Sequence, residues 1–259
     1  MRHSYQNKWL AIGLLFVVPQ IAQKATADVI ELDAVVTSVI YEPTVLSPDY
    51  TIFAHHLNYN VGYYTAPGFA PNQRRNFFLF NLAEIDEPIV AARLELYLPH
   101  SGYVSPDPSE LYRITSSAAP PSVFLSAFLG DPSVTPAMLE AMYATLGTGT
   151  LFSEVDIHAF EEGHSIAMEF SMDGVLALNM SLGELFVTGG RLVDITPESP
   201  GIPPSELVFA HSNVGVHSVP MPKLILVTAV PEPSAGLLVI FAAAVLAIST
   251  RRLKGVRTH

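Results

Sequence analysis

The sequence contains no cysteine among its 259 residues. This absence excludes a disulfide framework, on which small exported domains often rely when their core is small. It also excludes thiolate catalysis and any zinc or iron–sulfur site with cysteine ligands. A chain of this length can bury enough apolar surface for one good core without such links. The fold must therefore be held by packing.

Basic residues are scarce in the middle of the chain. Of the 13 Lys and Arg residues, three lie near the start and four crowd the end. The six that remain between the two ends are accompanied by nearly all of the 24 Asp and Glu residues. The central part is therefore strongly acidic, and an acidic surface repels phosphate backbones. We expect no nucleic-acid partner.

The common catalytic and cofactor signatures are absent as well. The sequence has no G-x-S-x-G nucleophile elbow, no H-E-x-x-H zinc motif, no phosphate-binding glycine loop and no EF-hand loop. We therefore predict no catalytic residue and no cofactor, and expect a protein that is not an enzyme.

Residues 1–27 have the organisation of a secretory signal peptide. A positively charged beginning is followed by an apolar run over residues 9–18, and small residues close the segment. Signal peptidase accepts small side chains at positions −3 and −1 of its substrate, which here are Ala25 and Ala27. We predict cleavage before Asp28, with signal peptidase as a partner.

The last 30 residues, 230–259, form a second segment of distinct composition. It opens with Val230-Pro231-Glu232-Pro233, whose prolines exclude a helix or a central strand and favour an extended spacer. An uncharged apolar run follows, and we expect a transmembrane helix over residues 235–250. A basic end at 251–257 keeps the C-terminus in the cytoplasm by the positive-inside rule. Its stop-transfer cations are Arg251, Arg252 and Lys254.

This arrangement resembles the PEP-CTERM sorting signal of Gram-negative bacteria. The V-P-E-P motif at 230–233, the apolar helix and the basic end follow one another as in that family. The resemblance implies that an exosortase, a membrane cysteine protease, releases or transfers the protein at the motif. The precursor would be a single-pass inner-membrane protein, and its product would reach the cell surface or the extracellular space. The alternative is an ordinary C-terminal membrane anchor with a chance motif.

The body of the chain, residues 28–229, is dominated by a period of two. Apolar and polar side chains alternate over residues 92–98 and again over 165–170, as they do in half-buried strands. Residues 76–81 are apolar on both faces, which predicts a central strand covered on both sides. The other predicted strands are Val29–Val39, Tyr50–His56, Glu110–Thr115, Leu151–Ile157, Glu184–Thr188, Glu206–Ala210 and Lys223–Thr228.

Two short helices interrupt this pattern. Thr135 offers an N-cap before Pro136, and Gly147 offers a stop, with apolar residues every four positions between them. A second helix is expected at 175–182. Many short strands with one or two short helices predict a mainly β fold, a β-sandwich of jelly-roll-like type. The stretch 74–99 is also similar to a strand pair in exported jelly-roll-like sandwich domains, some of which bind carbohydrate.

A metal site is conceivable between two of the predicted strands. His158 and His164 flank a turn that would close a hairpin, and Glu161 and Glu162 lie within it. A metal could bind at this tip, although a solvated polar turn is the alternative, because hairpin tips favour polar residues. The adjacent histidines at 55–56 would face opposite sides of a strand, so they cannot both bind one ion unaided.

Two other ligand classes deserve consideration. Structural calcium prefers carboxylate and carbonyl oxygens; its candidate ligands are Asp107, Glu110, Asp156 and Asp173. An aromatic group could instead form a sugar-stacking surface, because flat rings suit sugar faces, although burial in the core is the alternative. Its members are Tyr59, Tyr63, Tyr64 and Phe69, near Asn58 and Asn60.

The sequence thus favours an exported surface or matrix protein without enzymatic activity, with exopolysaccharide as a partner by implication. One alternative is a carbohydrate-binding module. Another is a carbohydrate-active enzyme on a sandwich scaffold, which would need two carboxylates placed across a cleft.

Overall fold

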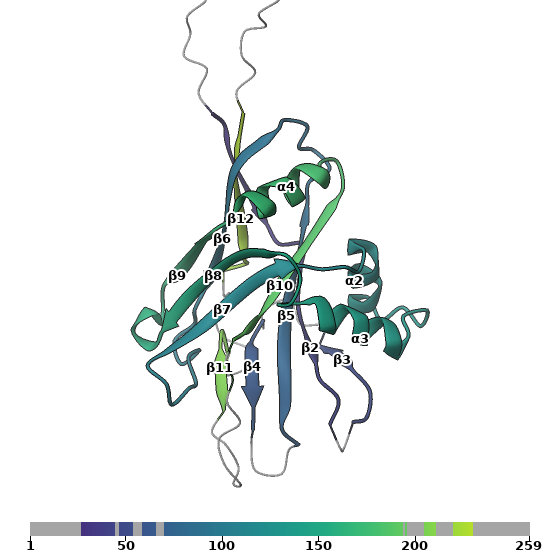
Figure 1. The fold of residues 1–259 in the computed structure, drawn as a ribbon, viewed down its shortest axis with the longest axis vertical. Coiled ribbons are helices and arrows are strands. Elements are labelled where there is room, and N and C mark those ends of the chain that lie inside the picture. Colours follow the sequence, from purple (N-terminus) through teal and green to yellow (C-terminus); the bar gives the residue numbers. More distant parts are fainter. Residues whose placement is uncertain are drawn as a thin grey trace, which may run out of the picture. The chain divides into compact units, whose positions relative to one another are not determined.

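The computed structural model describes residues 27–44, 47–53, 59–65, 70–193, 195, 205–210 and 220–229. Within them, Val29–Thr228 forms a compact unit that is mainly β. Its two packed antiparallel sheets and three short helices are drawn in Figure 1. None of the helices in this described part is long and apolar enough to span a membrane.

The smaller sheet has four antiparallel strands. Their order is β1 (Val29–Asp33), β12 (Lys223–Thr228), β6 (Ile89–Tyr97) and β9 (Ser165–Glu169). Strands β6 and β9 confirm the prediction from alternation, because every second side chain points into the core. The other face of the sheet is solvated and carries two ion pairs. One joins β1 to β12 and favours the pairing of these strands, and the other lies within β6. Lys223 Nζ lies 3.0 Å from Glu31 Oε2, and Arg93 Nη2 lies 2.9 Å from Glu95 Oε1.

The larger sheet has eight strands. The main path runs in the order β11 (Glu206–Val208), β4 (Val61–Tyr64), β5 (Asn72–Asn81), β10 (Leu185–Leu192), β7 (Ser109–Ser116) and β8 (Leu151–His158). Strand β2 (Val36–Tyr41) also pairs with β5, and β3 (Thr51–Phe53) pairs with β2. The sequence prediction missed β4, a four-residue strand whose Gly62 has a φ of +123°. Its sequence, Val-Gly-Tyr-Tyr, lacks the alternation of apolar and polar residues on which the prediction depends.

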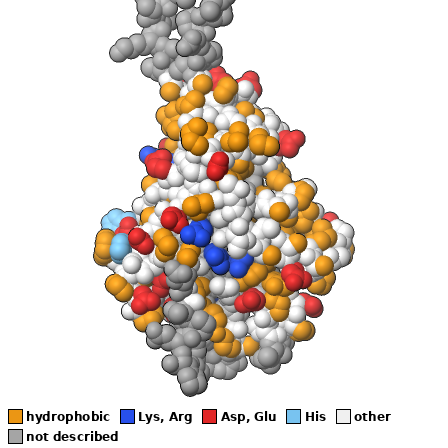
Figure 2. Space-filling view, viewed as in Figure 1, with side chains coloured by type: hydrophobic (Ala, Val, Ile, Leu, Met, Phe, Trp, Pro, Cys, Tyr) orange, Lys and Arg blue, Asp and Glu red, His pale blue; other side chains and the backbone are white. Residues whose placement is uncertain are grey.

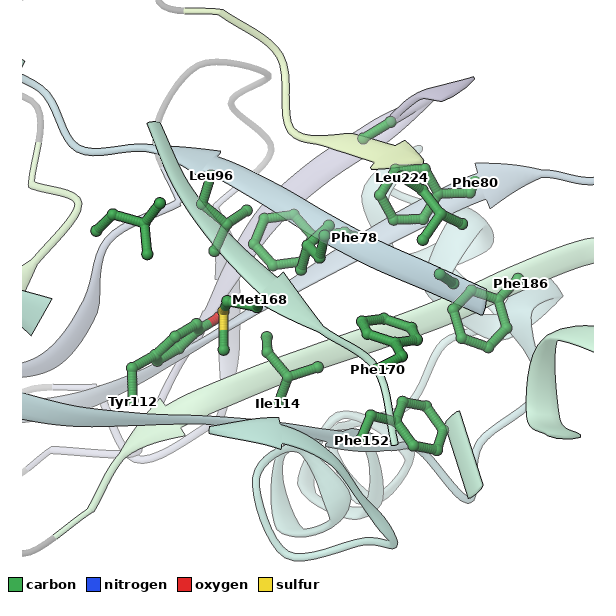
Figure 3. Packing of buried hydrophobic residues seen from close by; sticks show 14 of the residues in the cluster. Phe78, Phe80, Leu96, Tyr112, Ile114, Phe152, Met168, Phe170, Phe186 and Leu224 are labelled. Carbon is green, nitrogen blue, oxygen red and sulfur yellow. The ribbon is translucent and has the colours of Figure 1, made fainter. Parts of the chain in front are cut away.

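Strand β5 is buried on both faces, as its sequence predicts. Phe78 and Phe80 belong to the core between the two sheets, whereas Phe77 and Leu79 belong to a second core on the opposite face of the larger sheet. Figure 3 shows the first core, in which aromatic side chains from the larger sheet meet aliphatic side chains such as Leu224 of the smaller one. The prediction of a central strand covered on both sides is confirmed.

The three helices cover different parts of the sheets. Helices α2 (Pro121–Phe128) and α3 (Pro136–Thr145) supply buried side chains to the second core, and Figure 1 shows them beside β2 and β5. Helix α4 (Met172–Met180) packs against β6 and β8. The two predicted helices are confirmed, and the hydroxyl of Thr135 caps α3 by accepting the amide of Met138 at 3.3 Å. Helix α2 was missed because no side chain caps its start.

One predicted strand is in fact two. The stretch 29–39 was expected to be continuous, but β1 ends at Asp33 and β2 begins at Val36, and the two belong to different sheets. The chain crosses at Ala34, whose amide donates to Pro222 O at 2.9 Å, while the amide of Val35 donates to Leu79 O at 2.8 Å. The residues at the crossing, Ala34, Val35 and Val36, are all apolar, although Val35 is 47% exposed, so alternation does not reveal the break.

The predicted hairpin around residues 158–164 is wrong for a similar reason. Strand β8 pairs with β7 in the larger sheet, and β9 pairs with β6 in the smaller one. The connection between them contains a short 3₁₀ turn at Ala159–Glu161 and passes from the edge of one sheet to the edge of the other. Alternation identifies a strand and its buried face, but it does not identify the pairing partner.

A buried hydrogen-bond network joins the strands of the larger sheet. Asn76 is fully buried in β5, and its Nδ2 donates to Tyr59 O at 2.8 Å. Its Oδ1 accepts the hydroxyl of Tyr112 at 2.7 Å and the amide of Gly190 at 3.1 Å. The hydroxyl of Tyr59 donates to Tyr97 O at 2.7 Å and accepts the amide of the same residue at 3.1 Å. The network therefore reaches the smaller sheet.

We predict that Asn76→Leu lowers the free energy of unfolding of residues 28–229 by about 3 kcal/mol or more, because it leaves several buried polar groups without partners. Tyr112→Phe removes a single hydrogen bond and should cost about 1 kcal/mol. Urea unfolding followed by circular dichroism measures both changes.

The control is Asn81→Ala at the exposed end of the same strand, which should cost under about 1 kcal/mol. Equal losses for Asn76→Leu and Asn81→Ala would contradict the structural importance of the buried amide.

Candidate functional site

The two ends of the body meet at one end of the smaller sheet. Strands β1 and β12 pair antiparallel, with Val29 opposite Val227. Ala27 and Asp28, which flank the predicted signal cleavage, are exposed and precede β1 directly. Because antiparallel partners run in opposite directions, the chain enters β1 and leaves β12 at the same place.

The end of β12 is firmly held. Thr228 is fully buried, and its hydroxyl donates to Glu87 Oε2 at 2.9 Å. Its partner on β6 is Ile89, whose amide donates to Asn179 Oδ1 at 2.9 Å and whose carbonyl accepts Asn179 Nδ2 at 2.8 Å. The last strand is thus fixed up to the second residue before Val230.

The predicted sorting residues lie outside the described residues, as does Ala25. The same holds for the predicted transmembrane segment at 235–250. The residues concerned at the C-terminal end are Val230, Pro231, Glu232, Pro233, Arg251, Arg252 and Lys254. What the structure adds is the geometry of the junctions from which these segments begin.

The carboxylates near the two histidines at 158 and 164 are engaged by backbone amides. Glu161 Oε2 accepts the amide of His158 at 2.7 Å, and Glu162 Oε1 accepts the amide of Tyr103 at 3.0 Å. The ring of His158 stacks on Phe160 with centroids 4.9 Å apart. Nowhere in the described ranges do three or more His, Asp or Glu side chains group as a metal site would require. The histidines at 55–56 lie outside these ranges.

The four candidate calcium ligands are not brought together. Asp107, Asp156 and Asp173 are exposed, whereas Glu110 is only 5% exposed and points into the sandwich from β7. Glu110 Oε1 accepts the hydroxyl of Ser105. Burial raises the pKa of Glu110 above its ordinary value, and the nearby charge of Asp107 raises it further, against the opposing effect of the Ser105 hydrogen bond.

Those aromatic candidates that the structure describes do not form an open sugar-stacking surface. Tyr59 is 2% exposed and lies in the core, as the alternative of core burial predicts. The guanidinium of Arg74 covers the ring of Tyr64, 4.2 Å from its centroid, and Arg74 Nη1 donates to Asn60 Oδ1 at 3.1 Å. Tyr63 is half-buried in β4. Asn58 and Phe69 lie outside the described residues.

Comparison with known proteins adds no assignment. No family model matches the chain, and no curated protein sequence matches it significantly.

The raised pKa of Glu110 predicts a pH-dependent stability. The folded state binds this proton more tightly than the unfolded state. The contribution of Glu110 is therefore complete below the ordinary carboxyl pKa and is lost as the pH rises through the raised value. Glu110→Gln should remove this loss, so the variant gains stability relative to the wild type as the pH rises above the ordinary carboxyl pKa of about 4. Urea unfolding at successive pH values measures the difference.

Ser105→Ala provides the matched test. It removes a donor that favours the charged carboxylate, so the loss of stability should extend to higher pH than in the wild type. A constant difference between wild type and Glu110→Gln at every pH would contradict the prediction.

Proposed function

We propose that this protein is exported and then sorted at its C-terminal segment, as PEP-CTERM proteins are. Its body then acts at the cell surface or in the extracellular matrix as a jelly-roll-like sandwich without enzymatic activity. The observation that carries the proposal is the pairing of β1 with β12. The predicted cleavage before Asp28 and the motif at 230–233 adjoin the two ends of the compact unit Val29–Thr228. Neither lies within that unit.

Both terminal strands contribute to the core. Leu224 and Leu226 of β12 are fully buried, and Ile30 and Leu32 of β1 pack against the same cluster. Cleavage before Asp28 and at the motif would remove chain that lies beyond these strands. The body would keep its complete core, so processing would not require the fold to change.

The C-terminal segment, residues 230–259, supports the proposed path of export. An apolar segment at 235–250 followed by basic residues favours a single span with the C-terminus in the cytoplasm. The body is then on the outer side of the inner membrane, with the motif between body and bilayer. Signal peptidase acts at the N-terminal end of the body's chain, and an exosortase-type protease acts at its C-terminal end.

The two prolines of the motif provide the test. Changing Pro231 and Pro233 together to alanine should leave membrane insertion intact, because the apolar run and basic end are unchanged. The change permits helix to extend back through the motif, since proline no longer removes an amide or clashes with the preceding turn. A protease needs an extended substrate, so the uncleaved precursor should accumulate in the membrane. Fractionation with an antibody against the body, in a host with an exosortase, follows the outcome.

The comparison variant changes Arg251 and Arg252 to alanine. It should weaken orientation and retention in the membrane, because it removes positive-inside charge while the motif stays intact. Release of the double-proline variant as efficiently as wild type would mean that the motif is incidental and that residues 235–250 are a simple anchor.

A further inference from the structure

Three arginines lie in a row across the larger sheet. Arg191 of β10 is directly opposite Arg113 of β7, which is opposite Glu154 of β8. On the other side of β10, the last aligned pair is Gly190 with Asn76, so the next position along each strand places Arg75 of β5 beside Arg191. We call Arg75, Arg191 and Arg113 the arginine row. Neighbouring strands are about 4.8 Å apart, so the row spans about 10 Å.

The row concentrates half of the six basic residues of a strongly acidic body. Figure 2 shows Lys and Arg side chains gathered near the centre of one face, in the region where Figure 1 draws β5, β10 and β7. Like charges directly opposite one another on neighbouring strands are destabilising. The position of each guanidinium group must therefore be explained by its own contacts.

The two outer arginines have strong partners. Arg75 Nη1 donates to Tyr143 O at 2.7 Å and to Leu146 O at 3.0 Å, so it caps the C-terminal end of α3. Its guanidinium also lies 4.1 Å from the centroid of the Tyr143 ring. At the other end of the row, Arg113 Nη2 is 3.0 Å from Glu154 Oε2. A cation at a helix C-terminus and an ion pair both offset part of the repulsion.

The central arginine differs from its neighbours. Arg191 Nε donates to Gly147 O at 3.1 Å, and within the described part of the chain its two terminal nitrogens have no hydrogen-bond partner. Its aliphatic stem lies against Gly147, where a Cβ would come within 2.3 Å of Arg191 Cγ. The aliphatic stem and Nε of Arg191 are thus held in place, while its two terminal nitrogens are left for a ligand. In addition, among the described residues Arg75 Nε is buried without a hydrogen-bond partner, so one N–H donor beside Arg191 is unsatisfied.

We propose that the arginine row binds a carboxylate, with Arg191 as the residue that contacts it. A guanidinium fork matches a carboxylate with two parallel hydrogen bonds. Arg75 and Arg113 add positive potential on either side, and a bound anion would relieve the repulsion along the row.

The acidic surroundings limit the kind of ligand. Charges separated by more than about 8–10 Å are largely screened at ordinary salt, so the row acts on a group bound directly to it. A polyanion would extend onto the acidic surface and be repelled. The ligand class that fits is therefore a carboxylate on an otherwise uncharged molecule. If the body works outside the cell, as the proposed function holds, an acidic sugar is that class.

The experiment measures binding of glucuronate to the full-length protein in a non-ionic detergent by titration calorimetry. Arg191→Gln should weaken glucuronate binding about tenfold or more, because it removes a charge-assisted pair of hydrogen bonds. Arg191→Lys keeps the charge and loses the fork, so it should weaken binding by less. The matched control is Arg93→Gln on the smaller sheet, which changes the net charge equally and should leave binding unchanged. Melting temperatures verify that each variant is folded.

Several results would overturn the proposal. Equal weakening by Arg191→Gln and Arg93→Gln would mean that only net charge matters. Glucose binding as well as glucuronate would mean that the carboxylate is not recognised. Binding of inorganic phosphate without glucuronate would assign the row to a different anion. No glucuronate binding by a chain that is processed normally would refute this site and leave the proposed function standing. Glucuronate binding by a chain that is not processed at its tail would support this site and refute the proposed sorting.

Discussion

The side-chain amide of Asn76 is the contact on which the arrangement of strands most depends. It lies at the centre of a sheet buried on both faces, where water cannot replace a lost partner. Its two polar atoms bond three groups, from the segment before β4, from β7 and from β10. Tyr59 extends the network to the backbone of Tyr97 in the other sheet. In a chain without disulfides, a fully satisfied network of this kind specifies one register, because any slip leaves buried polar groups unpaired.

This register also fixes where the chain enters and leaves the body. Strand β5 is paired on both sides, and β2 aligns with it directly after the chain crosses from β1 in the smaller sheet. Strand β1 then pairs with β12, which ends at the buried Thr228. The two junctions are therefore a consequence of packing far from them. A force on the C-terminal segment would act on β12, which is paired with β1 on one side and with β6 on the other.

The sequence predicted those elements that carry a distinctive local pattern. Strands β6 and β9 alternate cleanly, β5 is apolar throughout, and α3 carries its own cap in Thr135. The pattern could not reveal that residues 29–39 change sheets, because the chain stays apolar as it crosses from one inner surface to the next. It also could not reveal that β8 and β9 belong to different sheets. Pairing is decided by long-range packing, which a single strand does not encode.

The proposed sorting segment and the arginine row differ in how far a site can be predicted from sequence. The segment at 230–259 is local, so motif, apolar run and basic end are visible together. The arginines at 75, 113 and 191 are far apart in the chain and become neighbours only through the register of three strands. One arginine would suffice to cap α3, and Arg75 already bonds its last carbonyls. The charges of Arg113 and Arg191 beside it add repulsion, which the ion pair of Arg113 with Glu154 offsets only in part. The remaining positive charge is what an anion would bind. The close contact of Arg191 with Gly147 holds this charge in place.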